Sequence, residues 1–299
     1  MEQLAHLQNQ GIEIPSIQWF PGHMAKTRRL IQSNLKLVDI VLEITDARIP
    51  QSSRNPELDK WIEGKPRMLV LNKCDNADPA ATRQWLRFYE KQGIVAMACD
   101  CKTGAGVKAF LPLVKKTLAE LLMRRKEKGM AGRMIRVMVV GVPNVGKSSF
   151  INRIAGTKRA KAEDRPGVTR GKQWVSLDQD VELLDMPGVL WPKFEDPLVG
   201  EKLAFTGAVK DGVVDIELLA ARLLSYLAQH YPKRLEERFK MTELDGLSGW
   251  ELLELAGKKR GMLVSGGEVN TERAAITVMD EYRGGKLGRL TFETPPEEE

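Results

Sequence analysis

Residues 137–148 read Val-Met-Val-Val-Gly-Val-Pro-Asn-Val-Gly-Lys-Ser. The apolar stretch 137–141 is typical of a buried parallel strand, and residues 141–148 match the pattern G-x-x-x-x-G-K-[ST]. We expect a helix from Ser148 to about Ala155. A loop between a strand and a helix binds phosphate because its backbone N–H groups and the positive end of the helix dipole face the anion. This stretch therefore predicts a phosphate-binding loop and an α/β fold.

The P-loop and a second motif supply the predicted phosphate and metal ligands. We expect the β-phosphate to be surrounded by the backbone around Asn144, Val145, Gly146, Lys147, Ser148 and Ser149. Lys147 would bridge the β- and γ-phosphates, and the Ser148 hydroxyl would bind Mg²⁺. Residues 185–188 match D-x-x-G: Asp185 would hold Mg²⁺ through water, and the Gly188 N–H would sense the γ-phosphate. Thr169, between the two motifs, is the candidate switch residue that closes on Mg²⁺.

Residues 72–75, Asn72-Lys73-Cys74-Asp75, match N-K-x-D. The carboxylate of Asp75 can accept hydrogen bonds from the ring N–H and the amino group of guanine, whereas adenine would leave it unpaired. Lys73 would lie along the base. The backbone near Asp100 and Cys101 would meet the guanine carbonyl. Together with the P-loop, the motif predicts that GTP and GDP bind.

The order of the motifs is reversed, because N-K-x-D precedes the P-loop, whereas it follows the P-loop in an ordinary GTPase. Strands are expected at 37–44, 68–71, 94–99, 137–141 and 181–184, and helices at 79–92, 107–123 and 148–155. Strands that alternate with helices predict a doubly wound, mostly parallel sheet. We therefore predict a circularly permuted P-loop GTPase domain over residues 16–205.

The pattern changes after Phe205, where apolar residues recur at helical spacing. Asp215 is a predicted helix cap, and Ser248 with Glu251 forms a capping-box pattern. Asn270 or Thr271 would cap a last helix. We predict an N-terminal extension over 1–15, a small all-helical domain over 206–283 and a flexible tail over 284–299.

Composition limits the class of protein. Of the 299 residues 42% are hydrophobic, which is enough for packed cores. No basic stretch precedes an apolar run at the start, and no apolar segment approaches the ~20 residues that cross a bilayer. The three cysteines lack metal-ligand spacing. These features predict a reduced, cytoplasmic location and no membrane partner.

The net charge of +6 favours an anionic partner. Basic side chains gather in three places, which we interpret as contacts to an RNA backbone; the alternative is a set of solvated charged faces. The candidates are Lys26, Arg28, Arg29, Lys158, Arg159, Lys161, Arg165, Lys258, Lys259 and Arg260.

The sequence resembles the circularly permuted GTPases, and within them those that assist bacterial ribosome assembly. The likeness rests on Gln18-Trp-Phe-Pro-Gly-His-Met24, on Asp46-Ala-Arg-Ile-Pro50 and on the permuted motif order. It implies a late assembly factor of the large (50S) subunit that binds rRNA and the precursor particle in the GTP state. It also implies slow hydrolysis that the particle stimulates, and an RNA-binding helical domain. We expect a monomer that does not bind DNA. Cys101 departs from the alanine of the usual Ser-Ala-Lys motif, but guanine needs only the backbone N–H.

The catalytic residue is less evident. Many GTPases carry glutamine directly after D-x-x-G to orient the attacking water, and here that position is Val189. His23 is the hypothesis, because an imidazole can orient a water proton near neutral pH and because the resemblance points to it. Alternatively, His23 packs in an N-terminal loop or touches RNA. Asn144 either helps to bind K⁺ beside the phosphates or caps the loop.

Two other functions stay open from the residues alone. One is a guanine-nucleotide switch for a protein partner, with the helical domain as adaptor. The other is an RNA-binding regulator in which the nucleotide is a structural ligand.

Overall fold

The computed structural model describes residue 17 and residues 21–62, 64–130, 132–156, 173–178 and 180–296. The chain forms two compact units. The sheet unit comprises Phe20–Pro192 and Glu293–Glu299, and the helical unit comprises Met1–Trp19 and Lys193–Phe292. Among the described helices, none combines the length and the apolar character that a bilayer crossing requires.

A six-stranded sheet in the order β3-β2-β1-β4-β6-β5 forms the centre of the sheet unit. All neighbouring strands are parallel except β5 and β6, which are antiparallel. The strands are β1 (Ile40–Asp46), β2 (Arg67–Asn72), β3 (Val95–Ala98), β4 (Ile135–Val140), β5 (Gln173–Asp178) and β6 (Val181–Asp185). This confirms the predicted mostly parallel α/β fold.

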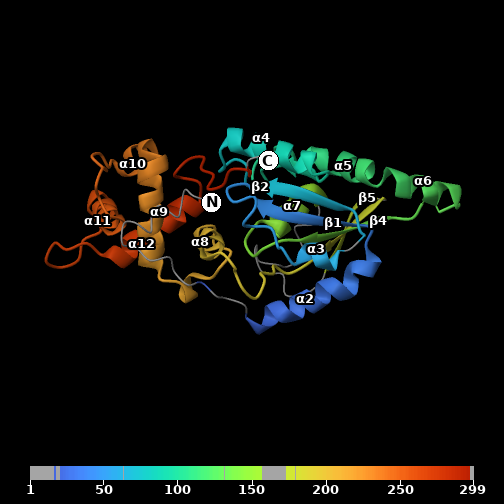
Figure 1. Cartoon of the computed structure of the whole chain (residues 1–299), viewed down its shortest axis with the longest axis horizontal. Helices are drawn as coiled ribbons and strands as arrows, with labels where there is room; N and C mark the ends of the chain where they lie inside the picture. The colour runs from blue at the N-terminus through green and yellow to red at the C-terminus, as the bar shows by residue number, and fades with distance from the viewer. Residues whose placement is uncertain are drawn as a thin grey trace. The chain divides into compact units, whose positions relative to one another are not determined.

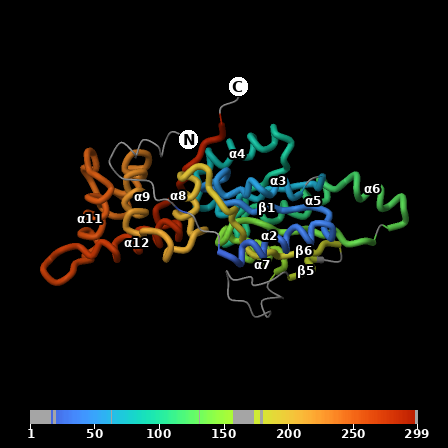
Figure 2. Tube along the Cα trace, turned by 60° about the horizontal axis from the view of Figure 1, so that its bottom comes forward, coloured from blue at the N-terminus to red at the C-terminus, as the bar shows by residue number. Residues whose placement is uncertain are grey.

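Helices lie on both sides of this sheet (Figures 1 and 2). They are α2 (Gly22–Asn34), α3 (Leu58–Trp61), α4 (Pro79–Lys91), α5 (Phe110–Thr117), α6 (Ala119–Glu127) and α7 (Lys147–Ala155), with 3-10 turns at Leu35–Leu37 and Val107–Ala109. The helix expected over 107–123 is divided into three pieces. Helix α2 and the edge strand β5 were not expected, because α2 is mostly polar and β5 is only six residues long, so that each offers a weak periodic signal.

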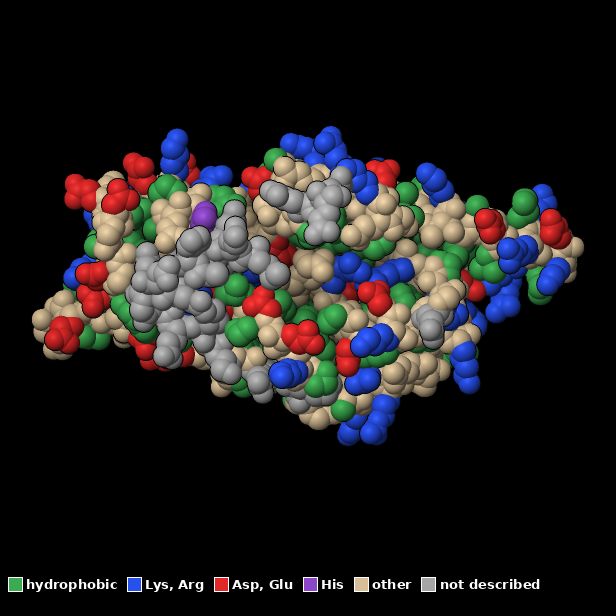
Figure 3. Space-filling view, in the orientation of Figure 1, with side chains coloured by type: hydrophobic (Ala, Val, Ile, Leu, Met, Phe, Trp, Pro, Cys, Tyr) green, Lys and Arg blue, Asp and Glu red, His purple; other side chains and the backbone are tan. Residues whose placement is uncertain are grey.

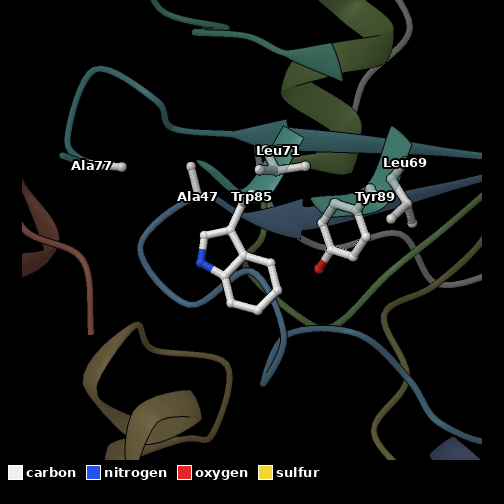
Figure 4. Packing of buried hydrophobic residues seen from close by; sticks show 6 residues of the cluster. All are labelled: Ala47, Leu69, Leu71, Ala77, Trp85 and Tyr89. Carbon is white, nitrogen blue, oxygen red and sulfur yellow. The ribbon is translucent and has the colours of Figure 1, made fainter. Parts of the chain in front are cut away.

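Helix α4 shows how the sequence positions the loop after β1. Asp78 caps the helix and Pro79 occupies its first turn. Trp85 and Tyr89, four residues apart, then lie on one buried face against Leu69 and Leu71 of β2 (Figure 4). Ala47 and Ala77 belong to the same cluster. The Tyr89 hydroxyl donates to the Pro50 carbonyl oxygen at 3.1 Å, which holds the loop that follows β1.

The helical unit is built around one buried helix, α9, against which α8, α10, α11 and α12 pack. These helices are α8 (Pro197–Phe205), α9 (Ile216–His230), α10 (Pro232–Phe239), α11 (Gly249–Lys259) and α12 (Thr271–Arg283), with a 3-10 turn at Asp211–Val213. Three predicted caps are confirmed. The Asp215 carboxylate accepts hydrogen bonds from two N–H groups of α9, Ser248 and Glu251 form a capping box, and the Asn270 side chain caps α12.

Part of the stretch expected to be a flexible tail is packed. Leu287, Leu290 and Phe292 are all buried. The Phe292 ring stacks on Phe205 with centroids 5.5 Å apart and lies 4.6 Å from the ring of Tyr226. Apolar residues at short, irregular spacing gave no helical or strand pattern, so the sequence alone did not indicate this packing.

Candidate nucleotide-binding site

The predicted nucleotide motifs lie at one edge of the sheet. In the β1–β2 register Asp46 is opposite Asn72, and in the β4–β6 register Val139 is opposite Asp185. These residues lie at or next to the carboxyl ends of parallel strands, where ligands bind in open α/β sheets. The fold therefore brings the P-loop, D-x-x-G and N-K-x-D together, although they are far apart in the chain.

The P-loop leads from β4 into α7, as its pattern predicted. Gly146 has a φ of 99° directly before the helix, a conformation that glycine adopts without strain. A Cβ atom at this position would collide with Asn72 Nδ2. Asn72 Nδ2 donates to the Val145 carbonyl oxygen at 2.8 Å. The first residue of N-K-x-D thus braces the P-loop, so the second glycine of the loop serves a close contact as well as a turn.

Lys147 is the buried cation of the site, with 7% of its surface exposed. Its Nζ donates to the carbonyl oxygens of Gly141 and Val142 at 3.1 and 3.0 Å. Burial lowers the pKa of Lys147 to about 8, and the charge of Asp185 partly opposes this shift. A nucleotide phosphate would supply the negative charge that favours the protonated amine.

The D-x-x-G segment lies directly on the P-loop. A Cβ atom at Gly188 would stand 2.7 Å from Pro143 Cα and 3.1 Å from Lys147 Nζ. The Val189 N–H donates to the Gly141 carbonyl oxygen at 3.3 Å. Val189 is 2% exposed, so this position offers an apolar side chain where other GTPases place a water-orienting group. Only glycine at position 188 leaves room for the D-x-x-G segment to lie this close to the P-loop.

The residues present fit Mg²⁺. Ser148 and Asp185 offer hydroxyl and carboxylate oxygens, which are the hard ligands that Mg²⁺ prefers, and the nucleotide phosphates and water would complete its octahedron. Over the described residues there is no group of three or more His, Cys, Asp or Glu side chains that could hold a metal by itself. A metal shared with the nucleotide is consistent with that finding. Thr169, the third expected metal ligand, lies outside the described residues.

The N-K-x-D motif is held by contacts that the sequence did not predict. Lys73 Nζ lies 3.0 Å from Asp46 Oδ2 and donates to the Asn144 carbonyl oxygen at 2.9 Å. Arg48 also donates to both oxygens of Asp46. Burial alone would raise the pKa of Asp46, but Arg48 and Lys73 hold it well below its usual range. Lys73 and Asn144 both have positive φ, 61° and 56°, a strained conformation that often marks functional loops.

The turn after β3 is organised around Asp100. Its carboxylate accepts hydrogen bonds from the N–H groups of Lys102 and Thr103 at 2.7 and 3.1 Å. Arg153 of α7 donates from Nε to the Cys101 carbonyl oxygen at 2.8 Å. Asp75 is half-buried, and its Oδ2 lies 3.9 Å from Lys102 Nζ. Arg153 was missed by sequence reasoning, because an arginine near the end of a helix carries no local signal of this contact.

His23 lies in the first turn of α2, and its side chain is exposed. Lys26 and Arg29 of α2 are also exposed, while Arg28 lies over the Trp61 ring and 3.3 Å from a Glu57 oxygen. Figure 3 shows Lys and Arg side chains gathered over α2 at the lower edge of the view. The switch-loop candidates Lys158, Arg159, Lys161 and Arg165 lie outside the described residues.

The third basic group belongs to the helical unit. Lys258 and Lys259 are exposed at the end of α11. Lys258 pairs within α11, with Glu254 at 3.7 Å. The Arg260 guanidinium, by contrast, lies 3.0 Å from a Glu281 oxygen of α12 and over the Phe239 ring of α10. Arg260 therefore contributes to the packing of the helical unit. Its position directly after two lysines in the sequence did not indicate this role.

Comparison with known proteins identifies the family. A family model described as 50S ribosome-binding GTPase matches residues 136–243. The ribosome biogenesis GTPase A of Priestia megaterium is 50% identical over 285 residues, covering 95% of this chain and 99% of that protein. The chain belongs to the ribosome biogenesis GTPase A family. The relative of that name from Thermotoga maritima is 31% identical over 279 residues, covering 93% of this chain and 95% of that protein.

A solved structure supports the same conclusion. The chain is similar to GNP-bound YlqF from T. maritima, with a TM-score of 0.63 and 29% identity over 90% of this chain and 98% of that one. This likeness confirms the circularly permuted GTPase fold. As a family member, the chain is a GTP hydrolase of ribosome biogenesis that binds GTP and GDP, normally with Mg²⁺.

Proposed function

We propose that this GTPase acts late in the assembly of the large ribosomal subunit. It binds the precursor particle through rRNA in the GTP state and leaves after hydrolysis. The likeness to ribosome biogenesis GTPase A over nearly the whole chain carries this proposal. The positions of Lys26, Arg29, Lys258 and Lys259 support rRNA contact, because exposed cations neutralise phosphates without reading sequence.

The contact of Gly188 with the P-loop supports a nucleotide-dependent switch. The segment after Gly188 leads through residues 189–192 to Lys193, where the chain enters the helical unit. Loss of the γ-phosphate would remove the bond to the Gly188 N–H and release this segment. The covalent connection would then pass this change to the helical unit. Such a release is an order-to-disorder or hinge transition of the kind that GTPase switches use.

Hydrolysis requires a water molecule to attack the γ-phosphorus while the bond to the β-phosphate oxygen breaks, which yields GDP, phosphate and a proton. Lys147 and Mg²⁺ would neutralise the charge that develops on the phosphates. The side chain of Val189 has no polar atom with which to orient the water. We therefore assign that role to His23, which the ribosomal particle brings to its place, so that turnover is slow without the particle.

Cosedimentation with isolated large-subunit precursors tests the proposed partner. We expect binding with a non-hydrolysable GTP analogue, weak binding with GDP, and a steep loss of binding as salt rises. Binding that is equal with both nucleotides would instead favour an RNA-binding regulator with a structural nucleotide. Failure to bind any particle, with GTP binding intact, would favour a switch for another protein.

Replacing His23 tests its catalytic role. Removing a group that orients the attacking water typically costs ~10²-fold or more in rate. His23→Ala should therefore reduce particle-stimulated turnover by about that factor and leave the Kd for GTP unchanged. His230→Ala, which removes another exposed histidine, is the matched control. Full stimulated turnover in His23→Ala would remove His23 from the mechanism.

The side chain of Asn144 is the candidate K⁺ ligand of the proposed site. A monovalent cation beside the phosphates would offset charge that develops during hydrolysis. We expect faster particle-stimulated turnover in KCl than in NaCl at equal ionic strength. Equal rates would leave Asn144 with a structural role in the loop.

A further inference from the structure

All three cysteines of the chain, Cys74, Cys99 and Cys101, lie on the base-reading side of the candidate site. The Cys74 N–H donates to the Cys99 carbonyl oxygen at 3.2 Å, and the Cys99 N–H donates to the Leu71 carbonyl oxygen at 2.9 Å. The sulfur atoms of Cys99 and Cys101 lie 4.0 Å apart. The described residues contain no cluster that could bind a metal ion. We therefore consider a role of these thiols other than metal binding.

The two neighbouring thiols have different environments. Cys99 is fully buried, whereas Cys101 is partly exposed. The hydrogen bond between the two sulfur atoms lowers the pKa of Cys101 and outweighs burial and the charge of Asp100, which raise it; the positive charge of Arg153 also lowers it. The same hydrogen bond, together with burial, raises the pKa of Cys99. A partly exposed thiol with a lowered pKa, beside a second thiol, is the arrangement found in cysteines that peroxides oxidise.

We propose that Cys101 is an oxidation site and forms a disulfide with Cys99, which weakens guanine-nucleotide binding. The oxidant is a peroxide. The Cys101 thiolate attacks one oxygen of hydrogen peroxide, an S–O bond forms, the O–O bond breaks and hydroxide leaves. The Cys99 thiol then attacks the oxidised sulfur, the S–S bond forms, and the oxygen departs as water. In total, two thiols and one hydrogen peroxide give one disulfide and two water molecules.

The disulfide would disturb the base-reading turn because the sulfur atoms must approach from 4.0 Å to about 2.05 Å. Residues 99–101 would move with them. Cys99 Sγ lies 3.6 Å from Asn72 Oδ1, and Asn72 in turn holds the Val145 carbonyl oxygen of the P-loop. The backbone that would meet the guanine carbonyl and the brace of the phosphate loop would therefore shift together. This inference rests on the proposed guanine site.

Peroxide treatment of the full chain tests the proposal with two separate readouts. Peptide mapping should show a Cys99–Cys101 disulfide, and the Kd for fluorescent GDP should rise by about tenfold, the loss of one good hydrogen bond. Dithiothreitol should reverse both changes. For each variant the measured quantity is the Kd after oxidation divided by the Kd before it. Cys99→Ala should bring this ratio close to one, whereas the matched control Cys74→Ala should keep the tenfold rise.

Cys99→Ala leaves a small buried cavity, which could itself alter the Kd. The same ratio is therefore also measured on Cys101→Ala, which keeps the backbone N–H and should likewise give a ratio close to one. A mapped Cys99–Cys101 disulfide without a change in Kd would overturn the link to nucleotide binding. A disulfide from Cys74, or no disulfide, would overturn the assignment of the pair. Reduced protein that binds no guanine nucleotide would instead overturn the proposed site itself, so the two failures are distinguishable.

Discussion

Lys147 illustrates how much a single side chain can reveal about the site. It is buried among P-loop carbonyl oxygens, and its pKa of about 8 is set mainly by burial. An ordinary lysine has a pKa near 10.5. A phosphate group beside Nζ would move the value back upward, because a nearby negative charge favours the protonated form. Nucleotide binding should therefore be coupled to the binding of a proton.

The first prediction concerns this proton. Near pH 8 the Lys147 amine is half protonated before binding. Binding of one nucleotide should therefore be accompanied by uptake of roughly half a proton by this amine, and the uptake should fall toward zero near pH 6.5. Affinity should correspondingly decrease as pH rises from about 8 to 9. Calorimetry in two buffers with different ionisation enthalpies measures the uptake. Identical enthalpies in both buffers at pH 8 would contradict the coupling.

A second prediction at this scale concerns Gly188. In Gly188→Ala the new Cβ would stand 2.7 Å from Pro143 Cα, so the D-x-x-G segment must move off the P-loop. We expect the affinity for GTP to fall by about tenfold, because one hydrogen bond to the γ-phosphate is lost, and the affinity for GDP to fall less. Gly212→Ala is the control, because nothing lies within 4 Å of its Cβ. Equal losses for both nucleotides would show that Gly188 does not sense the γ-phosphate.

Helices α8 and α9 are joined by an ion pair that is fully buried. Glu201 of α8 and Arg222 of α9 are both 0% exposed, and the guanidinium donates to both carboxylate oxygens. Such a pair adds little net stability over apolar residues, but removing one partner leaves an uncompensated buried charge. The pair therefore fixes how α8 packs on α9 more than it stabilises the unit.

The third prediction follows from that argument. Glu201→Leu should lower the free energy of unfolding of the helical unit by about 3–5 kcal/mol. The double variant Glu201→Leu with Arg222→Met should recover most of this loss, because no buried charge is left alone. Urea unfolding followed by circular dichroism measures both, and the two units are fitted as separate transitions. A double variant as unstable as the single one would show that the ion pair is needed for more than charge balance.

The C-terminal segment leaves the helical unit after Phe292 and returns to the sheet unit at Glu293. The Glu293 carboxylate accepts hydrogen bonds from the Gln51 and Ser52 N–H groups, the first at 2.7 Å. Its backbone carbonyl oxygen accepts one from Trp85 Nε1 at 3.0 Å. Glu293 therefore holds the loop that follows β1, although it is more than two hundred positions away in the chain.

The fourth prediction tests this closure. Glu293→Ala should lower the free energy of unfolding of the sheet unit by about 1–3 kcal/mol, since the N–H groups of Gln51 and of the buried Ser52 lose a charged acceptor. Tryptophan fluorescence in urea follows the unfolding, and Thr294→Ala, at an exposed neighbouring position, is the control. An unchanged midpoint in urea would mean that the segment contributes nothing to the sheet unit.

Local sequence patterns were enough to predict the α/β fold, the permuted motif order and several helix caps. These follow from residues close together in the chain, whose types limit backbone conformation and place apolar groups at a fixed period. The P-loop glycines, Asp215 and Ser248 are of this kind. The edge strand β5 and helix α2 escaped prediction because their apolar signal is short.

The contacts that join the motifs become visible only in the folded chain. The bonds from Asn72 to Val145 and from Lys73 to Asn144 connect residues 73 and 71 positions apart. The contacts of Arg153 with the base-reading turn and of Glu293 with Ser52 are likewise distant in the chain. No local pattern encodes such pairs, because they depend on which strands become neighbours in the folded sheet. That choice is made by the burial of many side chains at once.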